Sequence, residues 1–174
     1  MTAPAQLALV HAPIVGLVPY TIADANRLLE RWEHKLGICA RPFRQEAFAL
    51  ELDGKPLAVA ISASVVSDHV AGYKRNEVVE LARLGRTPDA PWVLRVMLRL
   101  WRAVCAPRWS CWPVKAAVSY HKQAWHSGDI YRFDGWEKAS ENCGSSGGGA
   151  WSRPRYAGDA AHGRKTLWVW RYSE

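Results

Sequence analysis

A hairpin signal in the first half of the chain constrains the fold more than any other feature. Residues 46–52 (EAFALEL) alternate weakly and are rich in strand formers, and Asp53-Gly54 follows them directly. This dipeptide is the strongest short-range signal for a tight β-turn. Residues 55–66 (KPLAVAISASVV) are apolar enough to return as a central strand, and residues 77–84 (EVVELARL) predict a third. The chain is therefore expected to build an antiparallel meander.

Helical periodicity is found in the sequence both before and after this meander. After an edge strand over 16–20, Thr21 is a plausible N-cap, and apolar residues recur at helical spacing as far as Leu36, just before Gly37. A second apolar stripe begins after Pro91 and ends before Pro107 (Val93, Val96, Met97, Leu100 and Val104). The opposite side of that helix carries three arginines and is expected to be a solvated face (Arg95, Arg99 and Arg102).

The second half of the chain adds three short strands, over 116–120, from Trp136 onward and over 167–172. A short helix or turn over 128–133 separates the first two. Residues 142–165 are basic and rich in Gly and Ser, so we expect a mobile loop there. The resulting order, β-α-β-β-β-α-β-α-β-loop-β, predicts a single α/β domain over 1–174 with a mixed sheet.

Composition excludes several classes of protein. The 174 residues suit one domain, and no apolar run is long enough to span a membrane. The first ten residues lack the pattern of a secretory signal, so a cytoplasmic protein is expected. The four cysteines (Cys39, Cys105, Cys111 and Cys143) do not have the spacing of a zinc site. They predict reduced thiols and no structural metal.

Two features of the composition point to possible partners. The chain has 23 Lys and Arg against 16 Asp and Glu, a net charge of +7. Such a charge favours nucleic acid, anionic cofactors or a membrane surface, although a merely solvated basic surface is the simplest alternative. The chain also has 10 Trp against 3 Phe. Most of these tryptophans are expected in the core, whereas a few in loops could stack on bases.

One segment resembles a known family. Residues 119–120 (SY) and 126–136 (HSGDIYRFDGW) are similar to the Ser-Tyr … His-x-Gly-x-Ile-Tyr … Trp stretch of Mom-like phage DNA-modification proteins, a divergent branch of the GNAT acyltransferases. Residues 32–37 (WEHKLG), 80–84 (ELARL) and 152–155 (SRPR) also resemble parts of that family. Together with the order of elements, these motifs cover most of the chain from residue 17 onward.

The resemblance implies a GNAT-like fold with a mostly antiparallel sheet, and a reaction. Mom-like proteins convert the exocyclic amine of adenine in double-stranded DNA to a methylcarbamoyl derivative, which protects phage DNA from host restriction. Acetyl-CoA or a related acyl-CoA is the implied donor, and iron is linked to the family. This chain departs from the pattern at two places. His121 and Lys122 stand where the family has an acidic residue, and residues 83–90 (RLGRTPDA) replace a Gly-rich phosphate loop.

Acyl transfer to an amine needs a proton acceptor and an acid for the leaving group. By the resemblance, Tyr131 is the candidate acid, and a core tyrosine is the alternative. His34 and His126 are candidate bases, since histidine titrates near neutral pH, or else simple surface residues. Glu80 lies mid-strand, where its carboxylate faces either a substrate cleft or a cationic partner. Tyr120 ends a strand, where α/β folds often bind ligands.

Two further groups are candidate binding residues. The turn after the third meander strand and the start of the following helix are expected to hold the acyl-CoA, through backbone N–H groups and one arginine (Leu84, Arg86, Ala90 and Trp92). Cations beside aromatics near the C-terminus are expected to bind nucleic acid (Trp151, Arg153, Arg155, Arg164 and Lys165).

Three functions therefore compete. The first is a phage or prophage enzyme that modifies adenine in DNA. The second is an acyl-CoA-dependent N-acyltransferase that acts on a small-molecule or protein amine. The third is a DNA-binding module that keeps the fold without the activity. A split between the strands that carry Glu80 and Tyr120 favours the second, whereas a Tyr131 buried away from any cleft favours the third.

Overall fold

The computed structural model describes residues 15–143 and 164–173. A seven-stranded sheet in the order β1-β2-β3-β6-β7-β9-β8 forms its centre. Its strands are β1 (Val15–Tyr20), β2 (Gln45–Leu52), β3 (Lys55–Ala63), β6 (Val78–Arg86), β7 (Ala116–Lys122), β8 (Glu137–Cys143) and β9 (Lys165–Arg171). The α-helices are α1 (Ile22–Arg31), α2 (Val93–Leu100) and α3 (Asp129–Arg132). The predicted α/β class with a mixed, mostly antiparallel sheet is confirmed.

The expected meander forms the first half of the sheet. β1, β2, β3 and β6 pair antiparallel in sequence. Asp53 and Gly54 both have positive φ, +49° and +74°, as the tight hairpin turn between β2 and β3 requires. This turn fixes the register that places Leu52 opposite Lys55.

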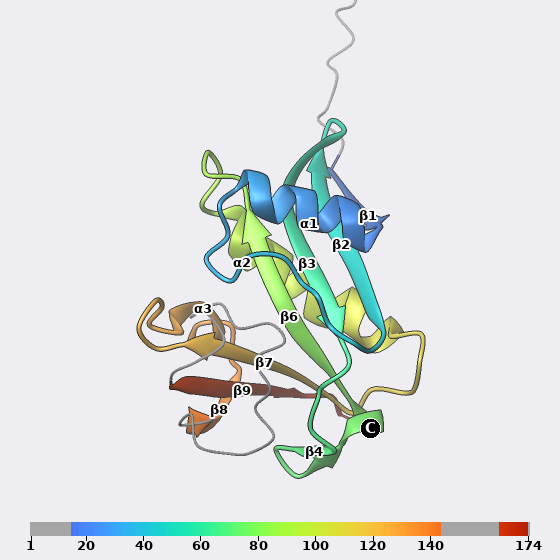
Figure 1. Ribbon diagram of the computed structural model, residues 1–174, viewed down its shortest axis with the longest axis vertical. Helices are drawn as coiled ribbons and strands as arrows, with labels where there is room; N and C mark the ends of the chain where they lie inside the picture. Colours follow the sequence, from blue (N-terminus) through green and yellow to red (C-terminus); the bar gives the residue numbers. More distant parts are fainter. Residues whose placement is uncertain (1–14, 144–163, 174) are drawn as a thin grey trace, which may run out of the picture.

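The second half of the sheet begins with the one parallel pair among the described strands. β6 pairs with β7 only from Val78 to Leu81, opposite Ala116 to Ser119, although both strands continue further. A bulge at Ala82 bends β6 at this point, since Leu81 lies opposite Ser62 and Arg83 opposite Ile61. Figure 1 shows the two strands together at their starts and apart at their ends. We call the place where their pairing stops the fork.

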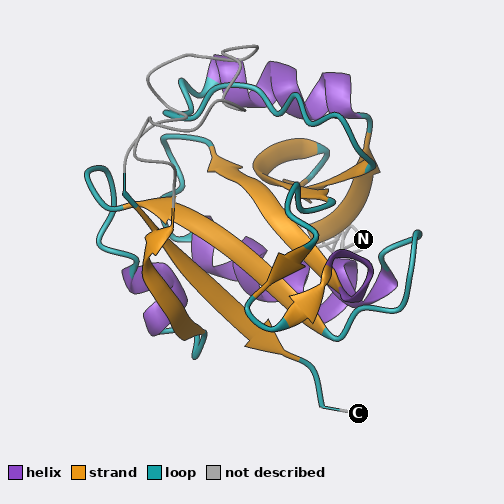
Figure 2. Ribbon diagram, turned by 60° about the horizontal axis from the view of Figure 1, so that its bottom comes forward, coloured by secondary structure: helices purple, strands orange, loops and turns teal. Residues whose placement is uncertain are grey.

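Helices cover both faces of the sheet (Figure 2). On one face, α1 buries Ala25, Leu28 and Leu29 against β2, β3 and β6. On the other, α2 buries Val93 and Met97, and it continues into a π-turn (η2, Trp101–Cys105) and a 3₁₀ turn (η3, Ala106–Arg108). We call these the α1 face and the α2 face.

One local expectation is wrong, a second is met only in part, and one segment contains elements for which no expectation was stated. The first helix ends at Arg31 rather than at Leu36, because Glu33 adopts a positive φ of +50° and reverses the chain. The polar segment after β3 contains a small hairpin, β4 (His69–Val70) with β5 (Tyr73–Lys74), and a 3₁₀ turn, η1 (Arg75–Glu77). Of the three arginines expected on a solvated face, Arg95 and Arg99 are exposed, but Arg99 and the part-buried Arg102 also bind the buried carboxylate of Asp134.

Both ends of the segment predicted to be a mobile loop, 142–165, belong to strands. Residues 142–143 belong to β8, and Lys165 begins β9. Residues 144–163 lie outside the described residues. The four cysteines are free thiols, two of them buried. Within the described segments, no helix has the length and apolarity needed to cross a bilayer.

Candidate active site

The fork leaves part of the β6 backbone facing away from β3. The N–H of Thr87 donates to Leu57 O at 2.8 Å, which fixes the phase of the antiparallel ladder. Every second residue along β6 bonds to β3, so Leu84 and Arg86 direct their N–H and C=O groups toward the side that β7 has left. The fork therefore offers an extended backbone edge to a ligand.

Tyr131 lies on the α2 face, with its hydroxyl at the fork. Its Oη is 2.9 Å from Ser119 Oγ, and Ser119 in turn donates to Leu81 O at 3.2 Å. Since Ser119 has a single hydroxyl hydrogen, Tyr131 is the donor in the first bond. Leu81 and Ser119 are the last residues that β6 and β7 pair. Burial raises the pKa of Tyr131, so its hydroxyl keeps its proton at neutral pH.

An aromatic cluster holds Tyr131 in place. Its ring stacks on Trp168 and His121, with centroids 5.6 and 6.3 Å away, and meets Trp136 edge-on. Gly128 begins the turn into α3 with a φ of +79°, and a Cβ there would lie 2.6 Å from His121 Cε1. The positive φ and the lack of space for a Cβ both explain why a glycine stands in the His-x-Gly motif.

His121 is a neutral hydrogen-bonding group. Its Nδ1 accepts from Trp168 Nε1 at 2.7 Å, so any proton on the ring is carried by Nε2. Burial lowers the pKa of His121, which favours this neutral form. His121 stands where the resembling family has an acid, and here it is packed among aromatic rings.

Glu80 lies on the α1 face of β6, one residue before the last paired position. It is 3% exposed and forms an ion pair with Arg41, which belongs to the segment between α1 and β2. Burial raises the pKa of Glu80, while Arg41, Arg83 and Lys165 act in the opposite direction. Tyr120 faces the same side, and burial together with Glu80 raises its pKa to about 12. A buried carboxylate with a raised pKa suits a proton acceptor.

Arg83 holds the segment that follows α1 against this face of the sheet. Its guanidinium donates to the carbonyls of residues 36, 37 and 38, and to that of Ala82. Asn26 of α1 holds Cys39 through its amide and carbonyl groups at 3.2 and 2.8 Å. These contacts fix the chain just before Arg41, and so place its guanidinium against Glu80.

The two candidate histidines occupy different positions. His34 is part-buried: its Nδ1 accepts from Leu36 N at 3.3 Å, so Nε2 donates to Leu84 O at 3.2 Å. Burial, with Arg83, lowers the pKa of His34 to about 4. It therefore stays neutral and braces β6. His126 is mostly exposed, and partial burial and Lys35 lower its pKa.

The candidate acyl-CoA residues line the end of β6 and the start of α2. The carbonyl of Leu84 is bound by His34, and the guanidinium of Arg86 donates to Thr87 O and Pro88 O. Ala90 is buried, whereas Trp92 is 62% exposed. No side chain caps the start of α2, although the N–H of Val93 already donates to Ala90 O at 3.3 Å.

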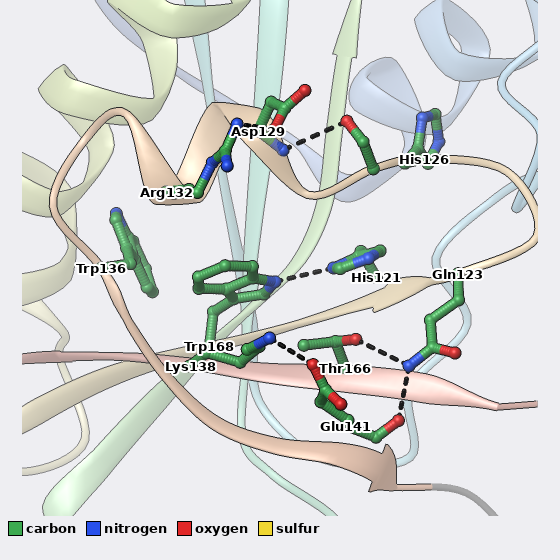
Figure 3. A pocket seen from close by; sticks show the side chains of 11 residues that line it. His121, Gln123, His126, Asp129, Arg132, Trp136, Lys138, Glu141, Thr166 and Trp168 are labelled. Atoms are coloured by element: carbon green, nitrogen blue, oxygen red, sulfur yellow. Dashed lines mark hydrogen bonds and ion pairs between the residues drawn. The ribbon is translucent and has the colours of Figure 1, made fainter.

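A separate pocket of about 590 Å³ lies beside α3 (Figure 3). His121, Trp168 and Trp136 line it, and two ion pairs, Asp129–Arg132 and Lys138–Glu141, stand on its walls. Tyr131 is not among its lining residues, so the pocket is distinct from the fork. His126 contributes to its edge.

Of the five candidate nucleic-acid residues, the structure describes Arg164 and Lys165. Trp151, Arg153 and Arg155 lie outside the described residues. Arg164 is exposed, and Lys165 lies in β9 beside the Glu80 group, opposite Lys122. Within residues 15–143 and 164–173, no set of three His, Cys, Asp or Glu side chains is arranged to hold a metal ion. The described residues therefore do not fit an iron site.

Sequence reasoning missed three contributors. Ser119 and His121 were not chosen as site residues, because their contacts join distant parts of the chain. Ser119 binds Tyr131, 12 residues away, and His121 binds Trp168, 47 residues away. Arg41 was not chosen because its partner, Glu80, lies 39 residues away in the sequence. A charged residue at the centre of an apolar strand was the one available signal, and it pointed to Glu80 alone.

Known structures share this architecture, whereas sequence comparison finds nothing. No protein-family model and no curated protein matches the chain. Among solved structures, the ribosomal-protein-S18-alanine N-acetyltransferase of Escherichia coli matches 94% of this chain and 96% of its own, with a TM-score of 0.59 and 14% identity. NAA60 of Arabidopsis thaliana, solved with a bisubstrate analogue, matches 92% and 100%, with a TM-score of 0.60 and 12% identity. The chain has the GNAT N-acetyltransferase fold.

A third matching structure was solved with a thioester of coenzyme A bound. The N-acetyltransferase PseH of Campylobacter jejuni, solved with acetyl coenzyme A, matches 92% of this chain and all of its own, with a TM-score of 0.51 and 9% identity. At such identities the shared property is the fold. The part of the earlier resemblance that concerns the GNAT fold is thus confirmed, while nothing in these matches indicates Mom-like DNA modification.

Proposed function

We propose that this protein is an acyl-CoA-dependent N-acyltransferase that acts on an amine of a small molecule or a protein. The observation that carries the proposal is the fork. There, an open backbone edge on β6 meets a protonated Tyr131 hydroxyl on one face and the buried Glu80 carboxylate on the other. Two groups that can transfer protons, on opposite faces of the sheet where β6 and β7 separate, suit transfer from a thioester to an amine.

The residues at the end of β6 support the binding of an acyl-CoA. The N–H groups of Leu84 and Arg86 and the C=O of Arg86 point away from β3, where an extended amide-containing chain can pair with them, while Leu84 O is bound by His34. The start of α2, which no side chain caps, and the positive charge of the Arg86 guanidinium, whose Nη1 binds Thr87 O and Pro88 O, support a pyrophosphate site there. Trp92 provides an exposed ring nearby.

The chemistry divides between the two faces. Acetyl-CoA, when bound, supplies an acyl group activated as a thioester. Glu80 accepts the proton that the amine loses as its nitrogen forms the new C–N bond. Tyr131 donates its proton to the sulfur as the C–S bond breaks, which leaves a neutral thiol. Ser119 holds the Tyr131 hydroxyl at the fork until that step.

Isothermal titration of the full chain with acetyl-CoA, followed by measurement of CoA release with a panel of amines, tests the proposal. We expect saturable acetyl-CoA binding and amine-dependent release of free CoA. A protein that neither binds acetyl-CoA nor releases CoA with any amine would not be an acyltransferase of this kind.

The adenine-modifying activity implied by the Mom-like motif stays a separate hypothesis. It rests on residues 119–136 and on basic residues that mostly lie outside the described part. Nucleoside mass spectrometry of DNA from cells that express the protein distinguishes it from the proposal above. A mass-shifted deoxyadenosine that disappears with Tyr131→Phe would favour DNA as the substrate.

A further inference from the structure

On the α1 face of the fork, the described residues place four cations around one carboxylate, Glu80. Lys122 and Lys165 lie directly opposite each other on β7 and β9. They share the face of Tyr120 and Leu167, since side chains two residues apart point the same way. Arg41 reaches the same place from the segment after α1. With Arg83, these residues form what we call the cationic cluster (Arg41, Arg83, Lys122 and Lys165).

The members of the cluster act on one another through space. The charges that act on Lys165 are three cations and the single carboxylate of Glu80, within the described residues. Burial and Arg41 lower the pKa of Lys165, whereas Glu80 raises it. Like charges that face each other across two strands destabilise a sheet. Within the described residues, these part-buried cations therefore outnumber the carboxylate that lies among them.

The hydrogen-bonding capacity of the cluster is unequal. Arg83 uses its guanidinium on four backbone carbonyls, so it contributes charge but few free donors. Lys122 lies over the ring of Trp125, 4.2 Å from its centroid. For Lys165, the described residues show no ion pair or hydrogen bond from the ammonium group. Arg41 binds Glu80 and is still 27% exposed at its side chain.

From this arrangement we propose that the acceptor is an amine with a carboxylate or phosphate-type anion only a few bonds from its nitrogen, as in an α-amino acid. The inference rests on the proposed acyltransferase function. Arg41 and Lys165 would bind the anionic group, while Glu80 receives the proton of the amine. Because Arg41 contacts Glu80 directly, the two groups of the acceptor must lie close together.

The test compares matched amines with the full chain and acetyl-CoA. One arm uses α-amino acids, a second their amides, a third aminoalkylphosphonates of similar length, and a fourth spermidine. We expect faster acetylation of the anionic amines than of the amides and spermidine. The first and third arms show whether a carboxylate or a phosphate-type group is preferred. Amides or spermidine that react equally well or better would overturn the proposal.

A variant identifies the residues involved. Lys165→Gln should raise the KM of the preferred anionic amine about tenfold, as expected for the loss of one charge-assisted contact, and leave that of its amide nearly unchanged. Lys55→Gln, at an exposed site in the β2–β3 hairpin, removes the same charge and should leave both unchanged. Equal effects of the two variants would show that only net charge matters, against the proposal.

Binding measurements separate this inference from the proposed function. Where no amine reacts, calorimetry of each anionic amine with the CoA-loaded protein takes the place of rates. Acetyl-CoA binding without saturable binding of any anionic amine would overturn the substrate class and keep the acyltransferase. Failure of acetyl-CoA itself to bind would remove the proposed function.

Discussion

The two faces of the sheet at the fork are built from opposite kinds of side chain. On the α1 face, the buried carboxylate of Glu80 lies among four cations of the described residues. On the α2 face, Tyr131, His121 and Trp168 form an aromatic cluster in which Trp168 Nε1 donates to His121 Nδ1, while the Tyr131 hydroxyl binds Ser119. The interaction between two charges is weak in water and stronger in the low dielectric of a protein interior. The fold thus keeps the proposed proton acceptor, Glu80, and the proposed proton donor, Tyr131, on opposite faces of the sheet.

This separation means that each face can be altered alone. Changes on the charged face should affect the acceptor amine and its proton, whereas changes on the aromatic face should affect the leaving group and the stability of the fold. The expected effects below run from the largest to the smallest.

Glu80→Gln removes the proton acceptor and keeps the shape of the side chain. We expect kcat to fall about 10²- to 10⁴-fold, the range for loss of a general base. Acetyl-CoA binding should persist, because the residues proposed to hold it lie further along β6. Steady-state kinetics and calorimetry measure the two effects. Glu137→Gln, on an exposed strand, is the matched control, and full activity in Glu80→Gln would remove Glu80 from the chemistry.

Tyr131→Phe tests the aromatic face in the same way. We expect kcat to fall about 10²-fold, because the leaving thiolate loses its acid while the ring still packs against Trp168. The KM of the acceptor should change little, since Tyr131 does not lie on the charged face. Thioesters with better leaving groups should recover part of the rate. A uniform loss with every thioester would instead indicate a structural role.

Gly128→Ala should damage the aromatic face without altering its chemistry. The new Cβ would meet Trp168 Cζ2 at 2.8 Å and would stand at a positive φ. We expect the free energy of unfolding to fall by about 2 kcal/mol. Urea denaturation measures the loss. Gly54→Ala has a positive φ but open space around it, so it should cost about 1 kcal/mol. Equal losses would mean that the contact with His121 and Trp168 is unimportant.

His34 predicts the smallest effect, on the acid sensitivity of the fold. Its folded-state pKa of about 4 lies below its ordinary value of 6.5. The unfolded chain therefore binds the proton first, and stability present above pH 6.5 is lost as the pH falls toward 4. His34→Gln should remove about 1 kcal/mol of the loss between pH 6.5 and 5.5. Urea midpoints at both pH values measure this, with His69→Gln, at an exposed site, as the control.

The sequence predicted the sheet well because its signals were local. Asp53-Gly54 and the alternating strands around it are read over a few residues, and the structure places them as expected. The end of α1 was predicted too late, since the apolar spacing continued to Leu36 while a left-handed Glu33 ended the helix.

The candidate site was only partly predictable, because its contacts join distant residues. Glu80 was chosen as a charge in an apolar strand, but its partner Arg41 carries no local signal. His34 was chosen for its chemistry, and its contact with Leu84 indicates a bracing role that spacing alone does not reveal. Lys165 was assigned to nucleic acid, and the structure places it beside Glu80 on the face proposed for the acceptor.

Hydrogen–deuterium exchange of the full chain with and without acetyl-CoA tests the role of the fork most directly. Protection should appear in residues 82–92, where the open edge of β6 leads into α2, and in residues 120–122 of β7. The β1–β2 pair, at the far edge of the sheet, should exchange as before. Unchanged exchange in 82–92 at a saturating concentration of acetyl-CoA, or protection confined to other segments, would contradict the assignment of the fork as the acyl-CoA site.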